Sequence, residues 1–154
     1  MAKQSVESYP TPTPIDIGKL NAFLKKNEEI DFRTADLLHT SNIEKYKWPK
    51  LKKDEKESLV KQLKAYQRML RVVPPGRDDL AKALLKNGIQ SSLQIASTPK
   101  KVFIQKNLEL FNNERTLAEQ VYLRALALRK AVTLQYMARV QQLEPHTRAA
   151  GLQR

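Results

Sequence analysis

Apolar residues recur along much of the chain at the spacing of amphipathic helices. In residues 54–73 they follow one another at steps of four and three, and lysine and arginine occupy the opposite side. The apolar positions are Leu59, Leu63, Tyr66, Leu70 and Val73. Asp54 is expected to cap this helix, and the sequence VPPG at 73–76 to end it. Since no alternating strand pattern of useful length occurs, the sequence predicts an all-α fold, a compact bundle of about six or seven helices ending in one long helix.

Shorter helices are predicted on both sides of this element. Their expected ranges are 16–26, 34–38, 41–46, 78–86, 92–96 and 99–111. Ser91 or Ser92 is expected to cap the helix that ends at Ala96. Thr98 followed by Pro99 is typical of a cap and a first helical residue.

The last predicted helix, over residues 114–143, is apolar on two sides. One side carries Leu117, Val121, Ala125, Leu128, Val132 and Tyr136, and the other carries Leu123, Leu126, Leu134 and Met137. A helix that is apolar nearly all round is usually buried on both sides. The rest of this small chain is expected to cover one side. The second side then binds another copy, another domain or a protein partner, unless the first 50 residues wrap over it.

The turn after the helix at 78–86 allows two interpretations. Gly88 suits the left-handed position that ends a helix, with Ile89 folding back onto Leu84. A helix, a tight turn with glycine and a second helix also resemble the helix-hairpin-helix unit, in which backbone amides bind DNA phosphates. That unit normally has two glycines, whereas this turn has one. The residues of such a phosphate site would be Lys86, Gly88, Gln90, Lys100 and Lys101.

Composition narrows the chemistry. The net charge is +12, and residues 44–71 carry ten cations and four anions, a pattern that favours acidic surfaces or polyanions as partners. Cysteine is absent and there are two histidines, which excludes disulfides and thiolate chemistry and leaves little for a metal site. No carboxylate pair sits in an apolar setting that would suit acid–base catalysis. We therefore expect no catalytic residue, metal, cofactor or small-molecule ligand, and no membrane span because charges interrupt the most apolar stretch.

The chain divides into three parts by composition. Residues 1–14, with a PTPTP run at 10–14, predict a disordered or strap-like proline-rich leader. Residues 15–144 are expected to form a single helical domain, followed by a polar tail at 145–154. The start of the chain has no apolar segment of the kind found in signal peptides.

Three stretches carry a family resemblance. LKAYQRMLRVVPPGRDDLAKALLKNGIQSSLQIA at 63–96, the aromatic residue Phe103, and ERTLAEQVYLRALALRKAVTLQYM at 114–137 follow one another in order. Residues 62–137 thereby resemble the helical module of Tc insecticidal toxin A components and of the Salmonella virulence plasmid A protein family. The positions that match the family pattern are Gln67, Arg68, Leu70, Gly88, Ser92, Ile95, Ala96, Phe103, Tyr122 and Ala125.

The resemblance implies a structural role. In those toxins the module belongs to the α-helical shell around the translocation channel and has no catalytic residues. We therefore expect a virulence-related, non-enzymatic interaction module, made in the bacterial cytoplasm, that docks onto a toxin or secretion-type assembly and can be exported with it. The alternative is a small basic nucleic-acid-binding protein that uses the turn at Gly88. A third option is an adaptor whose proline-rich leader is held by a partner.

Overall fold

The predicted all-α fold with a long last helix is confirmed. The computed structural model describes residues 12–142, and in these residues the chain forms seven helices and no strand. The helices are α1 (Gly18–Lys26), α2 (Thr40–Ile43), α3 (Lys53–Leu70), α4 (Asp78–Lys86), α5 (Ser92–Ala96), α6 (Lys100–Asn107) and α7 (Arg115–Gln142). The predicted tail, most of the leader, and residues 143 and 144 lie outside the described residues.

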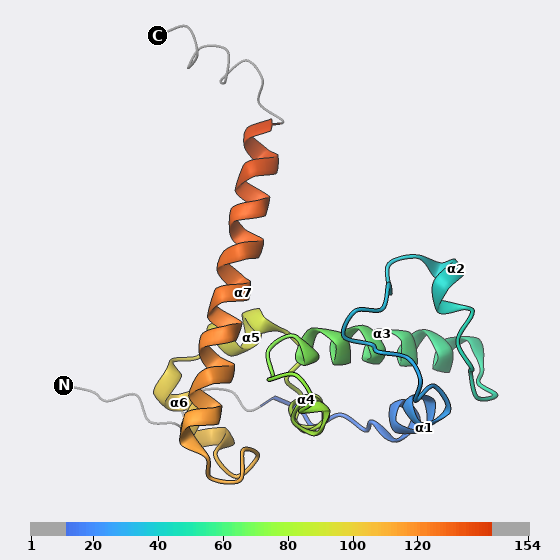
Figure 1. Cartoon of the computed structure of the whole chain (residues 1–154), viewed down its shortest axis with the longest axis horizontal. Coiled ribbons are helices and arrows are strands. Elements are labelled where there is room, and N and C mark those ends of the chain that lie inside the picture. The colour runs from blue at the N-terminus through green and yellow to red at the C-terminus, as the bar shows by residue number, and fades with distance from the viewer. Residues whose placement is uncertain (1–11, 143–154) are drawn as a thin grey trace, which may run out of the picture.

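The first group of helices packs around α3. In Figure 1, α1 and α4 lie along one side of α3, and α2 lies beyond its other side. The apolar side of α3 faces this core through Leu59, Leu63, Tyr66 and Leu70, all buried as their spacing predicts. Buried apolar area of this kind is the main stabilising contribution to such a bundle.

An aromatic cluster joins α1 to the loops before α3. The rings of Phe23, Phe32, Tyr46 and Trp48 lie with centroids 4.5–6.2 Å apart. Asn27, which is 1% exposed, ties the same segments together. Its Nδ2 donates to the backbone oxygens of Phe23 (2.8 Å) and Lys47 (3.0 Å), and its Oδ1 accepts from the Lys47 backbone N–H (2.9 Å).

Three local predictions are wrong. The helix expected over 34–38 is a turn at 32–34 followed by irregular chain. Asp36 there bonds the Leu38 backbone N–H through its side chain, which competes with helical hydrogen bonding. Asp54 lies in the first turn of α3 while Lys52 occupies the cap position. Pro99, and not Thr98, occupies the cap position of α6.

The second group of helices consists of α5, α6 and the first half of α7. Leu117, Ala118 and Val121 of α7 are buried against α5 and α6. The Tyr122 hydroxyl donates to the backbone oxygen of Thr98 at 2.6 Å, which fixes the loop between α5 and α6 against α7. The Arg124 Nε donates to the backbone oxygen at the end of α3, in Arg71, at 3.1 Å, and so links the two groups.

The end of α4 has the geometry expected from the glycine. Gly88 has φ +85°, its N–H donates to the Leu85 oxygen at 2.9 Å, and the Ile89 N–H donates to the Leu84 oxygen at 3.0 Å. These two bonds define a Schellman motif. The described end of the leader lies on this turn as a strap, where the Ile15 N–H donates to the Lys86 oxygen at 2.9 Å.

Gly88→Ala is expected to destabilise the chain more than Gly76→Ala. Both glycines have positive φ, at +85° and +83°, and a side chain there costs about 1–2 kcal/mol. A Cβ at Gly88 would also lie 2.2 Å from the Thr13 backbone oxygen, whereas one at Gly76 would meet nothing within 4 Å. Urea unfolding of the two variants measures the difference. Equal losses would show that the strap contributes nothing.

Candidate functional site

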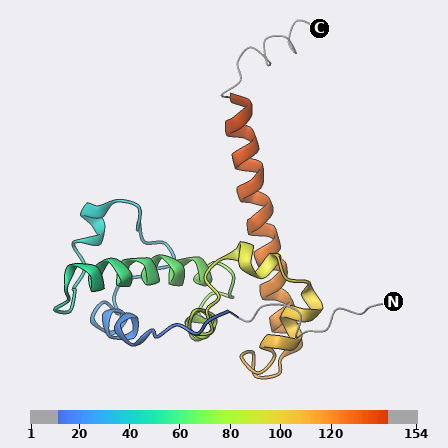
Figure 2. The same ribbon diagram turned by 180° about the vertical axis from the view of Figure 1, so that it is seen from behind.

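Among the described residues, the most unusual surface is the second half of α7. Figures 1 and 2 show α7 rising away from all other described helices, with only its first half beside α5 and α6. All side chains in residues 129–139 are exposed. Seven large apolar side chains are exposed in the described residues, and five of them lie on α7: Leu123, Val132, Leu134, Tyr136 and Met137, at 51–67%. We call residues 129–142 the projecting segment.

Three of the four residues predicted for the second side of this helix are exposed. Leu123, Leu134 and Met137 are 51%, 66% and 53% exposed. Leu126 is instead half-buried against the core, so its prediction as a free contact residue is wrong. Residues 12–50 do not cover these side chains, which remain exposed in the described part of the chain.

The predicted core side of α7 is covered along half of its length. Leu117, Val121 and Ala125 are buried and Leu128 is half-buried, but Val132 and Tyr136 are 63% and 67% exposed. Helix lengths explain this. α7 has 28 residues and spans about 42 Å, whereas α5 and α6, with five and eight residues, span about 7.5 Å and 12 Å. This length mismatch was visible in the sequence and would have identified Val132 and Tyr136 as uncovered.

The charge on the projecting segment has one sign. Residues 120–142 contain four cations, which are Arg124, Arg129, Lys130 and Arg139. The same residues contain no Asp or Glu. The three cations of the projecting segment are exposed. The segment therefore presents apolar side chains within a positive potential.

The backbone amides at the Gly88 turn are already used within the protein. The N–H groups of Gly88 and Ile89 donate to α4, and the Gln90 N–H donates to Oε1 of Gln94 at 3.0 Å. Gly88 itself is buried beneath the strap. The turn therefore offers an anion none of the three amides that a phosphate site of this type requires.

The lysines of the predicted phosphate site are spread over the surface. Lys86 and Lys101 are exposed, and the Lys100 Nζ lies 3.2 Å from the Glu119 carboxylate. Exposed ion pairs of this kind contribute about 0–1 kcal/mol.

The positions named by the family resemblance lie mainly inside the fold. Leu70, Gly88, Ile95, Ala96, Phe103, Tyr122 and Ala125 are buried. Ser92 is the first residue of α5, and the cap is Ser91, whose Oγ accepts from the Gln94 N–H at 3.1 Å. Of the two serines expected at the cap, the first therefore has this role.

Gln67 and Arg68 connect α3 to loops on opposite sides. Gln67 is buried, and its Nε2 donates to the backbone oxygens of Phe32 (2.8 Å) and Ala35 (2.7 Å). The Arg68 Nε donates to the Gln90 oxygen at 2.9 Å. Both side chains therefore have a structural role, because they hold irregular backbone segments in place.

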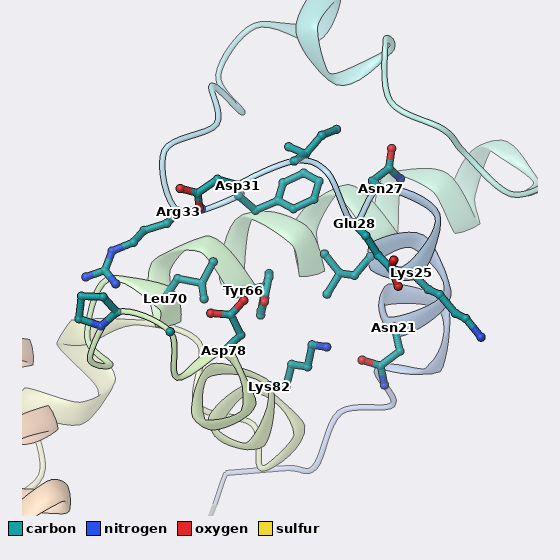
Figure 3. A pocket seen from close by; sticks show the side chains of 15 residues that line it. Asn21, Lys25, Asn27, Glu28, Asp31, Arg33, Tyr66, Leu70, Asp78 and Lys82 are labelled. Atoms are coloured by element: carbon teal, nitrogen blue, oxygen red, sulfur yellow. The ribbon is translucent and has the colours of Figure 1, made fainter.

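A cavity of about 610 Å³ lies between α1, α3, α4 and the loop after α1 (Figure 3). Its charged lining residues are Lys25, Arg33, Lys82, Glu28, Asp31 and Asp78. The three carboxylates are exposed and stay hydrated, so the cavity differs from the apolar cleft that perturbs a catalytic acid. Figure 3 shows Tyr66 at its inner wall.

Tyr66→Phe is expected to reduce the loss of stability at alkaline pH. Burial, followed by the nearby carboxylates of Asp78 and Asp31, raises the pKa of Tyr66 above its ordinary value of 10.0. Above about pH 10 the unfolded chain loses this proton while the folded chain keeps it, so stability falls as pH rises. Urea unfolding between pH 9 and 11 measures the slope. Tyr136→Phe is the control, since that ring is 67% exposed, and equal slopes in both variants would contradict the assignment.

The described part of the chain contains no helix that is long and apolar enough to cross a membrane. Within residues 12–142, histidine and carboxylate side chains form no group of three that could hold a metal ion. Comparison of the chain with protein-family models, curated proteins and solved structures finds no match.

Proposed function

We propose that this protein is a non-enzymatic helical interaction module that docks onto a larger assembly through the second half of α7. The observation that carries the proposal is the exposure of Val132, Leu134, Tyr136 and Met137, each more than half exposed. Large apolar side chains that gather on one exposed element mark protein interaction sites. The remainder of the molecule serves to anchor this helix.

The anchoring is well suited to that role. Tyr122 and the buried residues before it fix the first half of α7 to α5 and α6, and Arg124 fixes it to the end of α3. These contacts fix the point at which the projecting segment leaves the folded base. We propose that the assembly is of the toxin-translocation or secretion type, which rests on the resemblance of residues 62–137 to the toxin shell module.

Site-specific photo-crosslinking tests the proposal. With p-benzoylphenylalanine at Tyr136, a conservative aromatic replacement, we expect a covalent adduct with one partner in native host cells. The same group at Leu38, which is 88% exposed and lies in the loop before α2, is the matched control and is expected to give none.

Leu134→Glu with Met137→Glu is expected to abolish that adduct without unfolding the chain. Both side chains are exposed to solvent, so the free energy of unfolding should change by less than about 0.5 kcal/mol. Circular dichroism and urea unfolding check the fold. The proposal would be wrong if position 136 gave no adduct, or if the double variant kept it.

A further inference from the structure

We infer that the partner of the projecting segment is an acidic helical groove that encloses the segment from two sides, and not a second copy of this chain. This inference rests on the proposed function and specifies its partner. It draws on two observations, which are the distribution of the exposed apolar side chains and the sign of the charges between them.

The apolar side chains point in opposite directions. Successive residues of an α-helix are about 100° apart, so Val132 and Tyr136 lie about 40° from each other and Leu134 and Met137 about 60°. The two pairs are separated by roughly half a turn. A flat surface would cover one pair and leave the other in water. A groove between at least two helices covers both pairs.

Cations accompany both apolar pairs. In the same projection, Arg129 and Arg139 flank the pair of Val132 and Tyr136, and Lys130 lies between Leu134 and Met137. All three cations are exposed. A groove that encloses the segment brings its own rims close to these charges. Rims that carry Asp and Glu attract these cations and raise the association rate, whereas rims that carry Lys and Arg repel them.

This charge distribution disfavours a second copy. A pair of projecting segments, parallel or antiparallel, would bring Arg129, Lys130 and Arg139 of each chain together, and residues 120–142 contain no carboxylate to balance them. The placement of the apolar side chains on two sides of the helix, and not the charge, disfavours an anionic membrane surface. A helix lying on a membrane needs one apolar side facing the lipid and one polar side facing water.

A synthetic groove-forming helix provides the test. The probe is a fluorescein-labelled heptad peptide with Leu at positions a and d and Glu at positions e and g, two copies of which can enclose the segment from both sides. Its counterpart carries Lys in place of Glu. With the full chain we expect a saturable rise in the anisotropy of the Glu peptide that weakens as salt is raised, and no rise with the Lys peptide.

Two double variants with the same change in net charge separate specific from general attraction. Arg129→Glu with Lys130→Glu is expected to weaken binding of the Glu peptide at least about tenfold. Lys45→Glu with Lys50→Glu, at exposed lysines outside α7, is expected to leave it nearly unchanged. Similar weakening in both would overturn the inference, because the peptide would then be sensing only the overall charge of +12.

Light scattering and vesicle binding complete the design. Light scattering could show a concentration-dependent dimer that is absent in the variant Leu134→Glu with Met137→Glu. That result would identify a second copy as the occupant and overturn the inference. The chain could also sediment with phosphatidylserine vesicles and fail to do so in that same variant. That result would identify a membrane surface as the occupant and would also overturn the inference. Binding of neither peptide, with a crosslinked partner still found at position 136, would contradict the acidic groove while leaving the proposed docking function in place. Loss of the crosslink as well would remove both.

Discussion

Phe111→Ala is expected to lower the free energy of unfolding by about 3–5 kcal/mol. Phe111 is completely buried in the turn between α6 and α7, with its ring 6.2 Å from that of Phe103. The turn is held by the Asn113 N–H, which donates to the Leu108 oxygen at 2.9 Å and leaves little freedom to close a cavity. Since small domains have about 5–15 kcal/mol of stability in total, this loss is a large part of it.

Urea unfolding followed by circular dichroism measures the Phe111 effect. Leu38→Ala is the matched control, because that side chain is 88% exposed and its removal should change stability by less than about 0.5 kcal/mol. A loss below about 1 kcal/mol for Phe111→Ala would mean that α6, its turn and α7 are not packed as described.

Asn27→Ala is expected to cost about 2–4 kcal/mol, the second largest effect. The amide makes three hydrogen bonds to backbone groups of Phe23 and Lys47 and is 1% exposed. Its removal leaves buried backbone groups without these partners, and water cannot easily replace them. The loss includes the connection between the end of α1 and the loop that carries Trp48.

Asn42→Ala is the control for Asn27. The Asn42 Nδ2 donates to the Asp36 carboxylate at 3.0 Å, but Asp36 is exposed, so water can replace the bond and the cost should stay below about 1 kcal/mol. If the two variants had the same midpoint in urea, the buried amide would not be a structural anchor.

The regular helices were predictable because their local signals agree. The apolar spacing from Leu59 to Leu70 identified the buried side of α3, and Gly88 identified the end of α4 with its Schellman geometry. In both places the local conformation that the residues favour is also the one that packing requires. The cap of α5 is Ser91, the first of two adjacent serines that both favour this position.

The irregular segments were less predictable because distant residues determine them. The stretch 34–38 has helical spacing, yet Asn27 and Gln67 hold the neighbouring loops by bonds to backbone atoms far away in sequence. Nothing local in a polar connection marks one asparagine as buried. The prediction for 34–38 therefore failed where tertiary hydrogen bonding overrode the local preference.

The candidate site was predictable in chemistry but not in extent. The two apolar sides of α7 were visible in the sequence, and Leu134 and Met137 were named for partner contact. The apolar pattern alone places Val132 and Tyr136 on the covered side, and only the lengths of the predicted helices indicate where the body of the protein ends along α7. Leu126 was assigned to the partner and lies half-buried against the core.

The anchoring of only one half of α7 has a thermodynamic consequence for affinity. Beyond Leu128 the helix depends on its own backbone bonds, and isolated helical segments of this length are marginal in water. Binding therefore includes the entropic cost of ordering these turns. This cost raises the dissociation constant, and the rise is larger the smaller the fraction of molecules in which the segment is helical before binding. Exchange of Thr133 or Gln135 for alanine, a better helix former, would tighten association without touching the contacts themselves.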